Sequence, residues 1–429
     1  MKRSYVADVI KKDIDQVLVK GWVHNINCMG KVAFVQLRDK TGIIQIVADG
    51  SAVRDLRLEM CIEAAGVKVI NDKAPSGVEI HAESIDVIGK AYYDMLPFEV
   101  NKGKLKASLE TQLDYRTISM RSPRIRAIFK IQQEIEEAFK NYLRENGFSQ
   151  IHSPKIISSA TEGGSEMFTV DFFGRRAFLA QSPQFYKQMM VGAGFERVFE
   201  VGHAYRAELH NTWRHLSEYV SLDVEMGFID GADDLMDLEE GYINYLFGHL
   251  KAACAKELEL YGIALPEQVK IPRIPLGEAQ DILFEKYGKR SPSGNIDAEG
   301  EKLLSEYIRE TYGTDFVFLT RYPVAKRPMY AMPDKEDPDL TESFDLIYKG
   351  LEITTGGQRI HDYEMLRQNI MKFGLEPDNF TFYLDSFKYG MPPHGGFAIG
   401  LERLTMKILD LTNIRESTLF PRDIKRLEP

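Results

Sequence analysis

The spacing of apolar residues changes once along this chain, close to residue 122, and this change limits what the chain can fold into. Between residues 16 and 89, apolar and polar residues alternate in short runs such as QVLVKGWVHNI, KVAFVQLRD and IIQIVAD, which is typical of strands with one buried face. From residue 122 to 146, apolar residues recur every three or four positions, which is typical of an amphipathic helix. The sequence therefore predicts two domains, at residues 1–104 and 122–429, joined by a linker at residues 105–121.

The first domain has the pattern of a small β-barrel. Five strands are predicted, and a helix at residues 51–65 separates the third from the fourth. So many strands in so short a segment favour a Greek-key barrel of the OB type. An SH3-like barrel has the same periodicity and stays open as an alternative.

The second domain begins with the long helix at residues 122–146, which Ser122 can cap and Gly147 can end. Beyond it, strands and helices do not alternate regularly. The segment 198–226 reads as two strands of a hairpin, each with one apolar and one charged face. This pattern predicts a mainly antiparallel sheet with helices to one side, so the fold class is α+β.

Composition places the chain among soluble globular proteins. It has 429 residues, 44% of them hydrophobic and 28% charged, and no apolar run reaches the roughly 18 residues of a membrane helix. Its 3 cysteines are too few and too scattered for a disulfide framework or a zinc site. We expect a cytoplasmic protein that does not associate with membranes.

The charge distribution limits how the chain could meet a polyanion. The net charge is −10, but residues 1–104 hold 15 basic and 14 acidic side chains. Any contact with a polyanion is therefore expected to be local and not spread over the whole surface. A neutral first domain is also the ordinary expectation for a module of this kind. A metal site built from His203, His210 and His215 is not favoured, because their spacing fits no common ligand pattern.

Four stretches place charged residues and glycines in strands or at the junction of a strand and a helix: residues 177–194, 198–226, 350–366 and 391–409. None of them pairs a nucleophile with a base, and the motifs of P-loop, dinucleotide-binding, esterase and zinc-protease sites do not occur. The pattern favours chemistry by positioning and charge neutralisation, as in nucleotidyl transfer. A solvated sheet face with ion pairs across its strands is the alternative.

Three of these stretches contain residues whose roles the sequence alone leaves open. Lys187 follows Gln184 on one helix face, and either extends to solvent or anchors a carboxylate. Strand alternation places Glu352 and Thr354 on one face. Arg403 lies in the first turn of a helix that follows a Gly-rich strand.

The same stretches resemble the three signature motifs of the class II aminoacyl-tRNA synthetases. Motif one resembles FKNYLRENGFSQIHSPKI with its Pro154, motif two AYRAELHNTWRHLSEY, and motif three GGFAIGLERLTMKIL. The barrel segment GWVHNINCMGKVAFVQLRDKTGIIQIV is similar to that of the aspartyl, asparaginyl and lysyl subclass. QSPQFYKQ, RAELHNTWRHLSE, LEITTGGQRIHD and KYGMPPHGGFAIGLERL most resemble aspartyl-tRNA synthetases of the compact archaeal type.

This resemblance implies ATP and Mg²⁺ as partners in catalysis. Arg206, Glu208 and Arg403 are implied as the catalytic residues, with Arg206 on the α-phosphate of ATP. The residues implied to bind ATP are Arg206, Glu208, His215, Tyr219, Glu352 and Arg403. Glu352 and Thr355 are implied as Mg²⁺ ligands, which requires the strand to bend, because alternation alone pairs Glu352 with Thr354.

The implied amino-acid substrate is aspartate. Ser182, Gln184 and Asp223 would surround its α-amino group, and Lys187 and Arg359 would take its side-chain carboxylate. Glu162 would belong to a loop that closes over it. Aspartate would attack the α-phosphate of ATP to give aspartyl-adenylate and pyrophosphate, and the aspartyl group would pass to the 3′ end of tRNA.

The resemblance also implies tRNA(Asp) and tRNA(Asn) as substrates and a homodimer formed around Pro154. Phe34 and Gln45 would contact the anticodon, and His24 with Pro75 would accept either third base. Asn27-Cys28 stands where the family commonly has an arginine. The alternatives are an asparaginyl-tRNA synthetase, a tRNA-independent enzyme that forms an amide on aspartate, and a non-catalytic RNA-binding protein.

Overall fold

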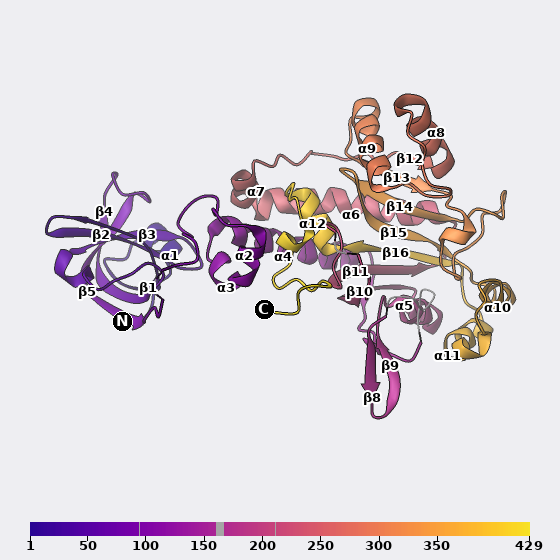
Figure 1. Ribbon diagram of the computed structural model, residues 1–429, viewed down its shortest axis with the longest axis horizontal. Coiled ribbons are helices and arrows are strands. Elements are labelled where there is room, and N and C mark those ends of the chain that lie inside the picture. The colour runs from indigo at the N-terminus through magenta and orange to yellow at the C-terminus, as the bar shows by residue number, and fades with distance from the viewer. Residues whose placement is uncertain (94, 160–166, 211) are drawn as a thin grey trace. The chain divides into compact units, whose positions relative to one another are not determined.

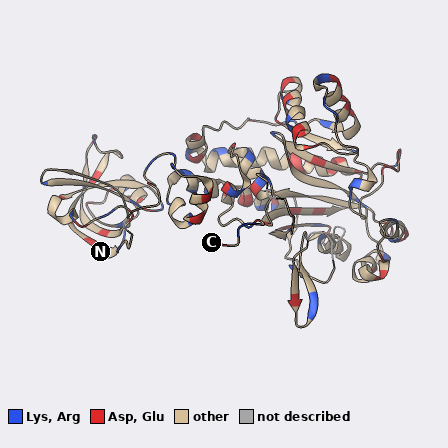
Figure 2. Cartoon of the chain, in the orientation of Figure 1, with Lys and Arg blue, Asp and Glu red and all other residues tan. Residues whose placement is uncertain are grey.

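The computed structural model describes residues 1–429 apart from residues 94, 160–166 and 211. The chain divides into two compact units, Met1–Pro123 and Arg124–Pro429 (Figure 1). Among the described residues, no helix is long and apolar enough to cross a membrane. Figure 2 shows both signs of charge on the surface helices, including α8 (Leu276–Tyr287) and α9 (Ala298–Tyr312).

The N-terminal unit is the predicted five-stranded barrel, closed in the order β1-β2-β3-β5-β4. Its core is formed by the inward residues of each strand, such as Val17, Val35, Ile46 and Ile62, since alternate side chains of a strand share a face. A short helix, α1, precedes it. The strands are β1 (Gln16–Met29), β2 (Val32–Arg38), β3 (Ile43–Asp49), β4 (Cys61–Ile70) and β5 (Val78–Gly89), with α1 at Val6–Lys11.

The helix predicted at residues 51–65 is wrong. Only Gly50–Val53 form a short 3₁₀ helix, and strand β4 begins at Cys61. Gly66 looked like a break between a helix and a strand, but it lies inside β4 at a register shift. A Cβ there would lie 2.1 Å from the carbonyl oxygen of His81, so close strand approach requires glycine.

The segment predicted as a linker contains regular structure of its own. Helices α2 (Leu109–Asp114) and α3 (Arg116–Ser119) lie between residues 105 and 121, and this segment falls within the N-terminal unit. Ser108 caps α2 by accepting a hydrogen bond from the backbone N–H of Thr111. The helices are too short for their periodicity to stand out in the sequence.

The C-terminal unit is built on an eight-stranded sheet in the order β12-β13-β14-β15-β16-β11-β10-β6. The central pairs are antiparallel and the outermost pair at each edge is parallel. The strands are β6 (Ser149–Gln150), β10 (Arg197–Tyr205), β11 (Glu218–Gly227), β12 (Arg273–Pro275), β13 (Phe316–Thr320), β14 (Ser343–Tyr348), β15 (Leu351–Arg359) and β16 (His394–Gly400).

Helices cover this sheet unequally on its two faces. The predicted long helix α4 (Pro123–Glu145) and helix α6 (Ala232–Ala253) share a core with one face. Helices α8 and α9 cover only the β12–β14 end of the other face, where Val317 and Leu319 point. The rest of that second face, over β15, β16 and β11, carries a pocket.

Shorter elements complete this unit. A second sheet consists of β7 (Ile156–Ile157), β9 (Arg175–Leu179) and β8 (Thr169–Phe172). The remaining helices include α5 (Gln184–Met190), which starts two residues after Ser182, and α12 (Leu401–Ile408), which follows β16 directly. The others are α7 (Ala255–Tyr261), α10 (Tyr363–Lys372) and α11 (Thr381–Leu384).

Candidate active site

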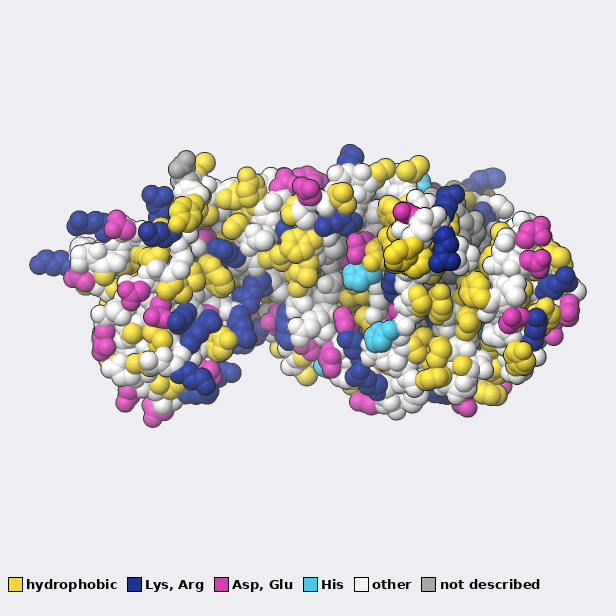
Figure 3. Space-filling view, turned by 90° about the horizontal axis from the view of Figure 1, so that it is seen from below, with side chains coloured by type: hydrophobic (Ala, Val, Ile, Leu, Met, Phe, Trp, Pro, Cys, Tyr) yellow, Lys and Arg dark blue, Asp and Glu magenta, His cyan; other side chains and the backbone are white. Residues whose placement is uncertain are grey.

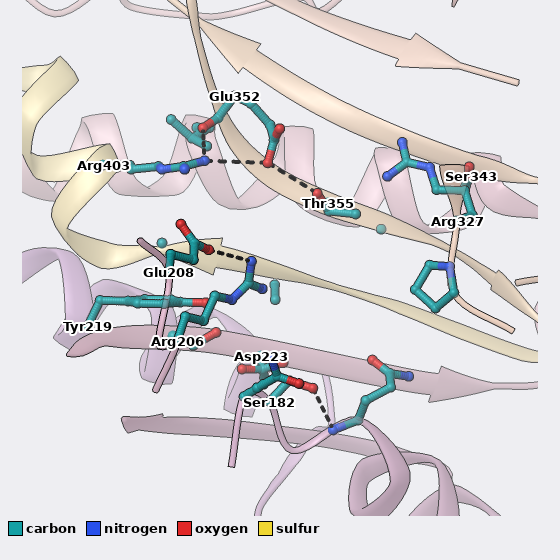
Figure 4. A pocket seen from close by; sticks show the side chains of 18 of the residues that line it. Ser182, Arg206, Glu208, Tyr219, Asp223, Arg327, Ser343, Glu352, Thr355 and Arg403 are labelled. Atoms are coloured by element: carbon teal, nitrogen blue, oxygen red, sulfur yellow. Dashed lines mark hydrogen bonds and ion pairs between the residues drawn. The ribbon is translucent and has the colours of Figure 1, made fainter. Parts of the chain in front are cut away.

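One pocket of about 380 Å³ brings together the predicted site residues of the C-terminal unit. They come from α5, β11, β15, α12 and the segment that follows β10, which are far apart in the sequence (Figure 4). The predicted residues that line the pocket are Ser182, Gln184, Lys187, Arg206, Glu208, His215, Tyr219, Asp223, Glu352, Thr355, Arg359 and Arg403.

At one end of the pocket, two cations and two acids form a buried network. The Nζ atom of Lys187 lies 3.1 Å from Oδ1 of Asp223 and 3.3 Å from Oε2 of Glu225. The Nε atom of Arg359 donates to Oε1 of Glu225 over 3.1 Å. Lys187 therefore does not extend to solvent, and we call these four residues the buried charge network.

Glu225 joins the two cations and was missed in the sequence. Burial opposes its charged form, but Arg359 and Lys187 together hold the pKa of Glu225 below its usual value. Strand alternation contained the signal, because Ser221, Asp223 and Glu225 share one face of β11.

At the other end of the pocket, the charged groups are more open. The guanidinium of Arg206 lies 3.7 Å from Oε1 of Glu208 and 5.8 Å from the centre of the Tyr219 ring. His215 lies 3.8 Å from Glu208 and contacts Thr212. Burial lowers the pKa of His215, although Glu208 opposes this effect. Polar groups with this freedom can rearrange around a polyanionic ligand.

Glu352 and Thr355 both lie on the pocket face of β15. The resemblance implies this placement, whereas strand alternation alone would put Thr355 on the opposite face. Leu346 of β14 pairs with Thr354, and the next residue pairs with Glu352. One extra residue, Ile353, is therefore inserted as a β-bulge. The hydroxyl of Thr355 donates to Oε1 of Glu352 over 3.3 Å (Figure 4).

The chemistry of this pair fits Mg²⁺. Mg²⁺ prefers oxygen ligands and is commonly held by one or two carboxylates together with substrate phosphates. Glu352 and Thr355 supply a carboxylate and a hydroxyl, and Arg403 donates to the backbone oxygen of Glu352 over 2.9 Å. In the described part of the chain, no cluster of three or more His, Cys, Asp or Glu could hold a metal by itself.

Three further cations line the pocket and were missed: Arg214, Lys326 and Arg327. Arg214 donates to Oε2 of Glu301 over 2.9 Å, and Arg327 pairs with Asp345 at 2.8 Å while its guanidinium covers the Tyr322 ring. Arg327 lies in the loop after β13, and its contacts depend on tertiary structure alone. The sequence offered no local signal for it.

Two other predictions concern Glu162 and a three-histidine metal site. Glu162 lies outside the described residues. His203 contacts Glu218 at 3.1 Å and does not line the pocket with His215. Among the described residues, no group of three or more His, Cys, Asp or Glu is placed to hold a metal ion.

The residues predicted to contact an anticodon lie in the N-terminal unit. Phe34 and Gln45 point outward from β2 and β3, and Gln45 donates to Oε2 of Glu79 over 2.9 Å. Pro75 is exposed in the turn between β4 and β5. These three positions remain open to a ligand.

Neighbouring side chains constrain the imidazole ring of His24. Its side chain is buried, and Nδ1 lies 2.9 Å from Nη1 of Arg38, which also binds Glu59. Burial and Arg38 lower the pKa of His24. Since arginine can only donate, Nδ1 must accept, and the neutral ring carries its proton on Nε2.

Comparison with known proteins defines the class of this protein. Residues 108–424 match the family model described as tRNA synthetases class II (D, K and N), and residues 17–88 match the OB-fold nucleic acid binding domain. The chain belongs to this family of class II tRNA synthetases. It is an aminoacyl-tRNA ligase that uses ATP, which confirms the predicted family and fold.

Particular relatives match the chain from end to end. The aspartate–tRNA(Asp/Asn) ligase of Deinococcus radiodurans is 45% identical and covers 100% of this chain and 99% of its own length. The aspartate–tRNA(Asp) ligase of Pyrococcus abyssi is 44% identical, with 100% of both chains covered. The crystal structure of asparaginyl-tRNA synthetase from Pyrococcus horikoshii, complexed with asparaginyl-adenylate, has a TM-score of 0.93 at 31% identity, with 100% of both chains covered.

Proposed function

We propose that this enzyme activates L-aspartate with ATP and transfers it to tRNA. The buried charge network supports this proposal most directly. Two buried cations, Lys187 and Arg359, face the pocket, and a carboxylate ligand would complement them where a neutral amide would not. The high identity to aspartate–tRNA ligases points the same way. The fold itself cannot decide, because an asparaginyl enzyme shares it.

We assign the amino-acid end of the pocket as follows. Lys187 and Arg359 bind the side-chain carboxylate of aspartate. Asp223, with Ser182 and Gln184, accepts or orients the α-ammonium group. The α-carboxylate then faces the open end of the pocket, and it is already anionic, so no protein base is required for its attack on the phosphate.

The open end is assigned to ATP. Arg206 neutralises charge that develops on the α-phosphate, and Glu208 and Tyr219 hold the adenine, which Arg403 covers from the other side. His215 and Arg403 contact the triphosphate tail. Glu352 and Thr355 hold Mg²⁺, which supplies charge neutralisation to the phosphates when bound.

Amino-acid-dependent exchange of pyrophosphate into ATP tests this proposal. We expect exchange with aspartate, and exchange with asparagine lower by about 10³ or more, since unpaired buried polar groups give discrimination of about 10⁴–10⁵ at their strongest. Charging of purified tRNA with aspartate should follow. Equal exchange with asparagine, or exchange without tRNA charging, would favour one of the two alternative enzymes.

We further propose that the enzyme charges both tRNA(Asp) and tRNA(Asn). Their anticodons share G and U and differ only in the last base, C or U, so Phe34 and Gln45 reading the central U cannot separate them. The Nε2–H donor of His24 fits O2, an acceptor that C and U have in common. The D. radiodurans relative, named as a ligase of both tRNAs, is consistent with this.

The N-terminal unit offers basic side chains for such a contact. Its face in Figure 3 carries Lys and Arg among Asp and Glu side chains, and residues 1–104 hold 15 basic and 14 acidic side chains in a chain that is acidic as a whole. The test is aminoacylation of both purified tRNAs under one set of conditions. A preference for tRNA(Asp) above about a hundredfold, roughly 2.7 kcal/mol, would contradict relaxed specificity while leaving aspartate activation intact.

The last part of the proposal concerns the cellular location and the oligomeric state of the enzyme. We expect a cytoplasmic homodimer formed through the segment around Pro154, next to the exposed Ile156. Light scattering at micromolar concentration measures this. An active monomer would contradict the dimer.

A further inference from the structure

We propose that Glu239, on the face of the sheet opposite the pocket, sets the register of β15 through Thr354 and thereby places Glu352 and Thr355 for the metal–nucleotide complex. Glu239 lies on α6 and is fully buried. It is a positioning residue that touches no substrate. The inference rests on the proposed assignment of ATP and Mg²⁺ to Glu352 and Thr355.

The β-bulge at Ile353 determines which side chains of β15 face the pocket. In a regular strand, Glu352 and Thr354 would share one face, and Thr355 would point to the other. With Ile353 inserted, the Ile353 side chain packs in the core that the sheet shares with α6, and the Thr354 hydroxyl bonds to Glu239 of α6, with 2% and 1% of their surfaces exposed. Glu352 and Thr355 are left on the pocket face, in contact with each other.

The hydrogen bond between Glu239 and Thr354 favours one register of β15. The hydroxyl of Thr354 donates to Oε1 of Glu239 over 2.6 Å, and both side chains are buried. A threonine hydroxyl buried without a partner is unfavourable, so this bond favours the register in which Thr354 faces α6. A shift of one residue would bring Thr355 to this face and remove it from the pocket.

Glu239 buries a polar carboxyl group in an apolar core, which is unfavourable. Its second oxygen, Oε2, is buried and has no hydrogen-bond partner among the described residues, and the surrounding core is apolar, with Leu235, Met236 and Ile243 on the same helix. Replacing both Glu239 and Thr354 by apolar residues of similar shape would cost little or no stability. A buried acid aimed at the bulged strand is explained by the register that it selects.

Two pairs of substitutions separate this role from packing. Thr354→Val keeps the shape of the side chain and removes the donor, whereas Thr354→Ser keeps the donor. Glu239→Leu removes the acceptor, whereas Glu239→Gln keeps one. Glu352→Gln, which alters the proposed ligand itself, serves as the positive control.

The measurement is binding of Mn²⁺ to the enzyme with ATP present, followed by electron paramagnetic resonance, together with the KM for aspartate. We expect Thr354→Val and Glu239→Leu to weaken Mn²⁺ binding about tenfold, or about 1.4 kcal/mol. Thr354→Ser and Glu239→Gln should stay within about threefold of the parent, and the KM for aspartate should not change. Mn²⁺ binding does not depend on which amino acid is activated, so failure of the proposed substrate would not disturb it.

Two outcomes would overturn the inference. One is parental Mn²⁺ affinity in folded Thr354→Val, which decides the matter even if Glu239→Leu does not fold. The other is an equal loss of Mn²⁺ affinity and aspartate affinity in Thr354→Val, because this would indicate general loosening of the sheet.

Discussion

Both ends of the pocket carry charged side chains, but these side chains differ in how far they are buried. In the buried charge network, the side chains of Lys187 and Glu225 are 2% and 0% exposed, and each charge has a partner of opposite sign. At the open end, the side chains of Arg206 and Glu352 are 39% and 37% exposed. Burial is thus the main difference between them.

This difference matches two separate tasks. Where the charges of a pocket are buried and paired, a ligand with a neutral group in place of a charged one leaves a buried charge without a partner. Such an unpaired charge is costly. Such a site suits the choice between an acid and an amide. Open charges are screened and adjustable, which suits the binding of a flexible triphosphate tail whose own charge orders the groups around it.

The largest effect is expected from Lys187→Met. It removes one cation from the buried network, so aspartate-dependent pyrophosphate exchange should fall by about 10³ or more. Lys155→Met is the matched control, since Lys155 pairs with Glu200 at 2.6 Å and does not line the pocket. Exchange at the parental rate in Lys187→Met, with a native circular dichroism spectrum, would refute the assignment.

Arg206→Ala should have the next largest effect. Loss of one electrostatic group that acts in the transition state typically lowers the rate by about 10²–10³. The loss should appear in kcat for exchange, with the KM for aspartate little changed, because Arg206 lies at the open end. Arg273→Ala, which removes ion pairs with Asp233 and Asp237, should leave the rate unaltered. A rate within a few-fold of the parent would be incompatible with this role.

Glu225→Gln tests the pairing within the buried network. It leaves Lys187 and Arg359 with Asp223 as their remaining acid, so the free energy of unfolding should fall by about 3 kcal/mol. Saturating aspartate should raise the melting temperature more in this variant than in the parent, since its carboxylate replaces the missing charge. Equal shifts from aspartate would argue against direct contact with these cations.

The smallest effect, taken per pH unit, is a dependence of stability on pH that arises at a residue lining the pocket. Burial raises the pKa of Glu402 to about 8, although the backbone N–H of Val220 donates to its oxygens. The folded state therefore keeps a proton that the unfolded state loses above about pH 4.5, and stability declines as pH rises toward 8. Glu402→Gln should reduce this slope by up to one proton, about 1.4 kcal/mol per pH unit, in urea unfolding. An unchanged slope would contradict the shift.

Sequence patterns predicted the elements with long, uniform periods. The helix at residues 122–146, the hairpin at residues 198–226 and the barrel strands all have patterns in which most positions agree. The helix expected at residues 51–65 failed because Gly66, inside a strand, has the same local appearance as a strand boundary. This position requires glycine because a carbonyl oxygen of the neighbouring strand leaves no room for a Cβ atom.

The site shows the same limit. Lys187 and Asp223 could be proposed from residue type and resemblance, and Glu225 was within reach of strand alternation. Thr355 could not be placed by alternation, because the bulge at Ile353 depends on pairing with β14. The ion pair between Arg327 and Asp345 joins a loop to a strand, and no local pattern predicts such contacts.

The most direct test of the central claim is the binding of two inert adenylate analogues by calorimetry: the sulfamoyl adenosine esters of aspartate and of asparagine. They differ only at the side chain that the buried charge network would contact, and the open end meets the same adenosine in both. The account predicts that the aspartyl analogue binds at least about a hundredfold more tightly, or about 2.7 kcal/mol. Equal affinity, or tighter binding of the asparaginyl analogue, would contradict the claim that this network selects the amino acid.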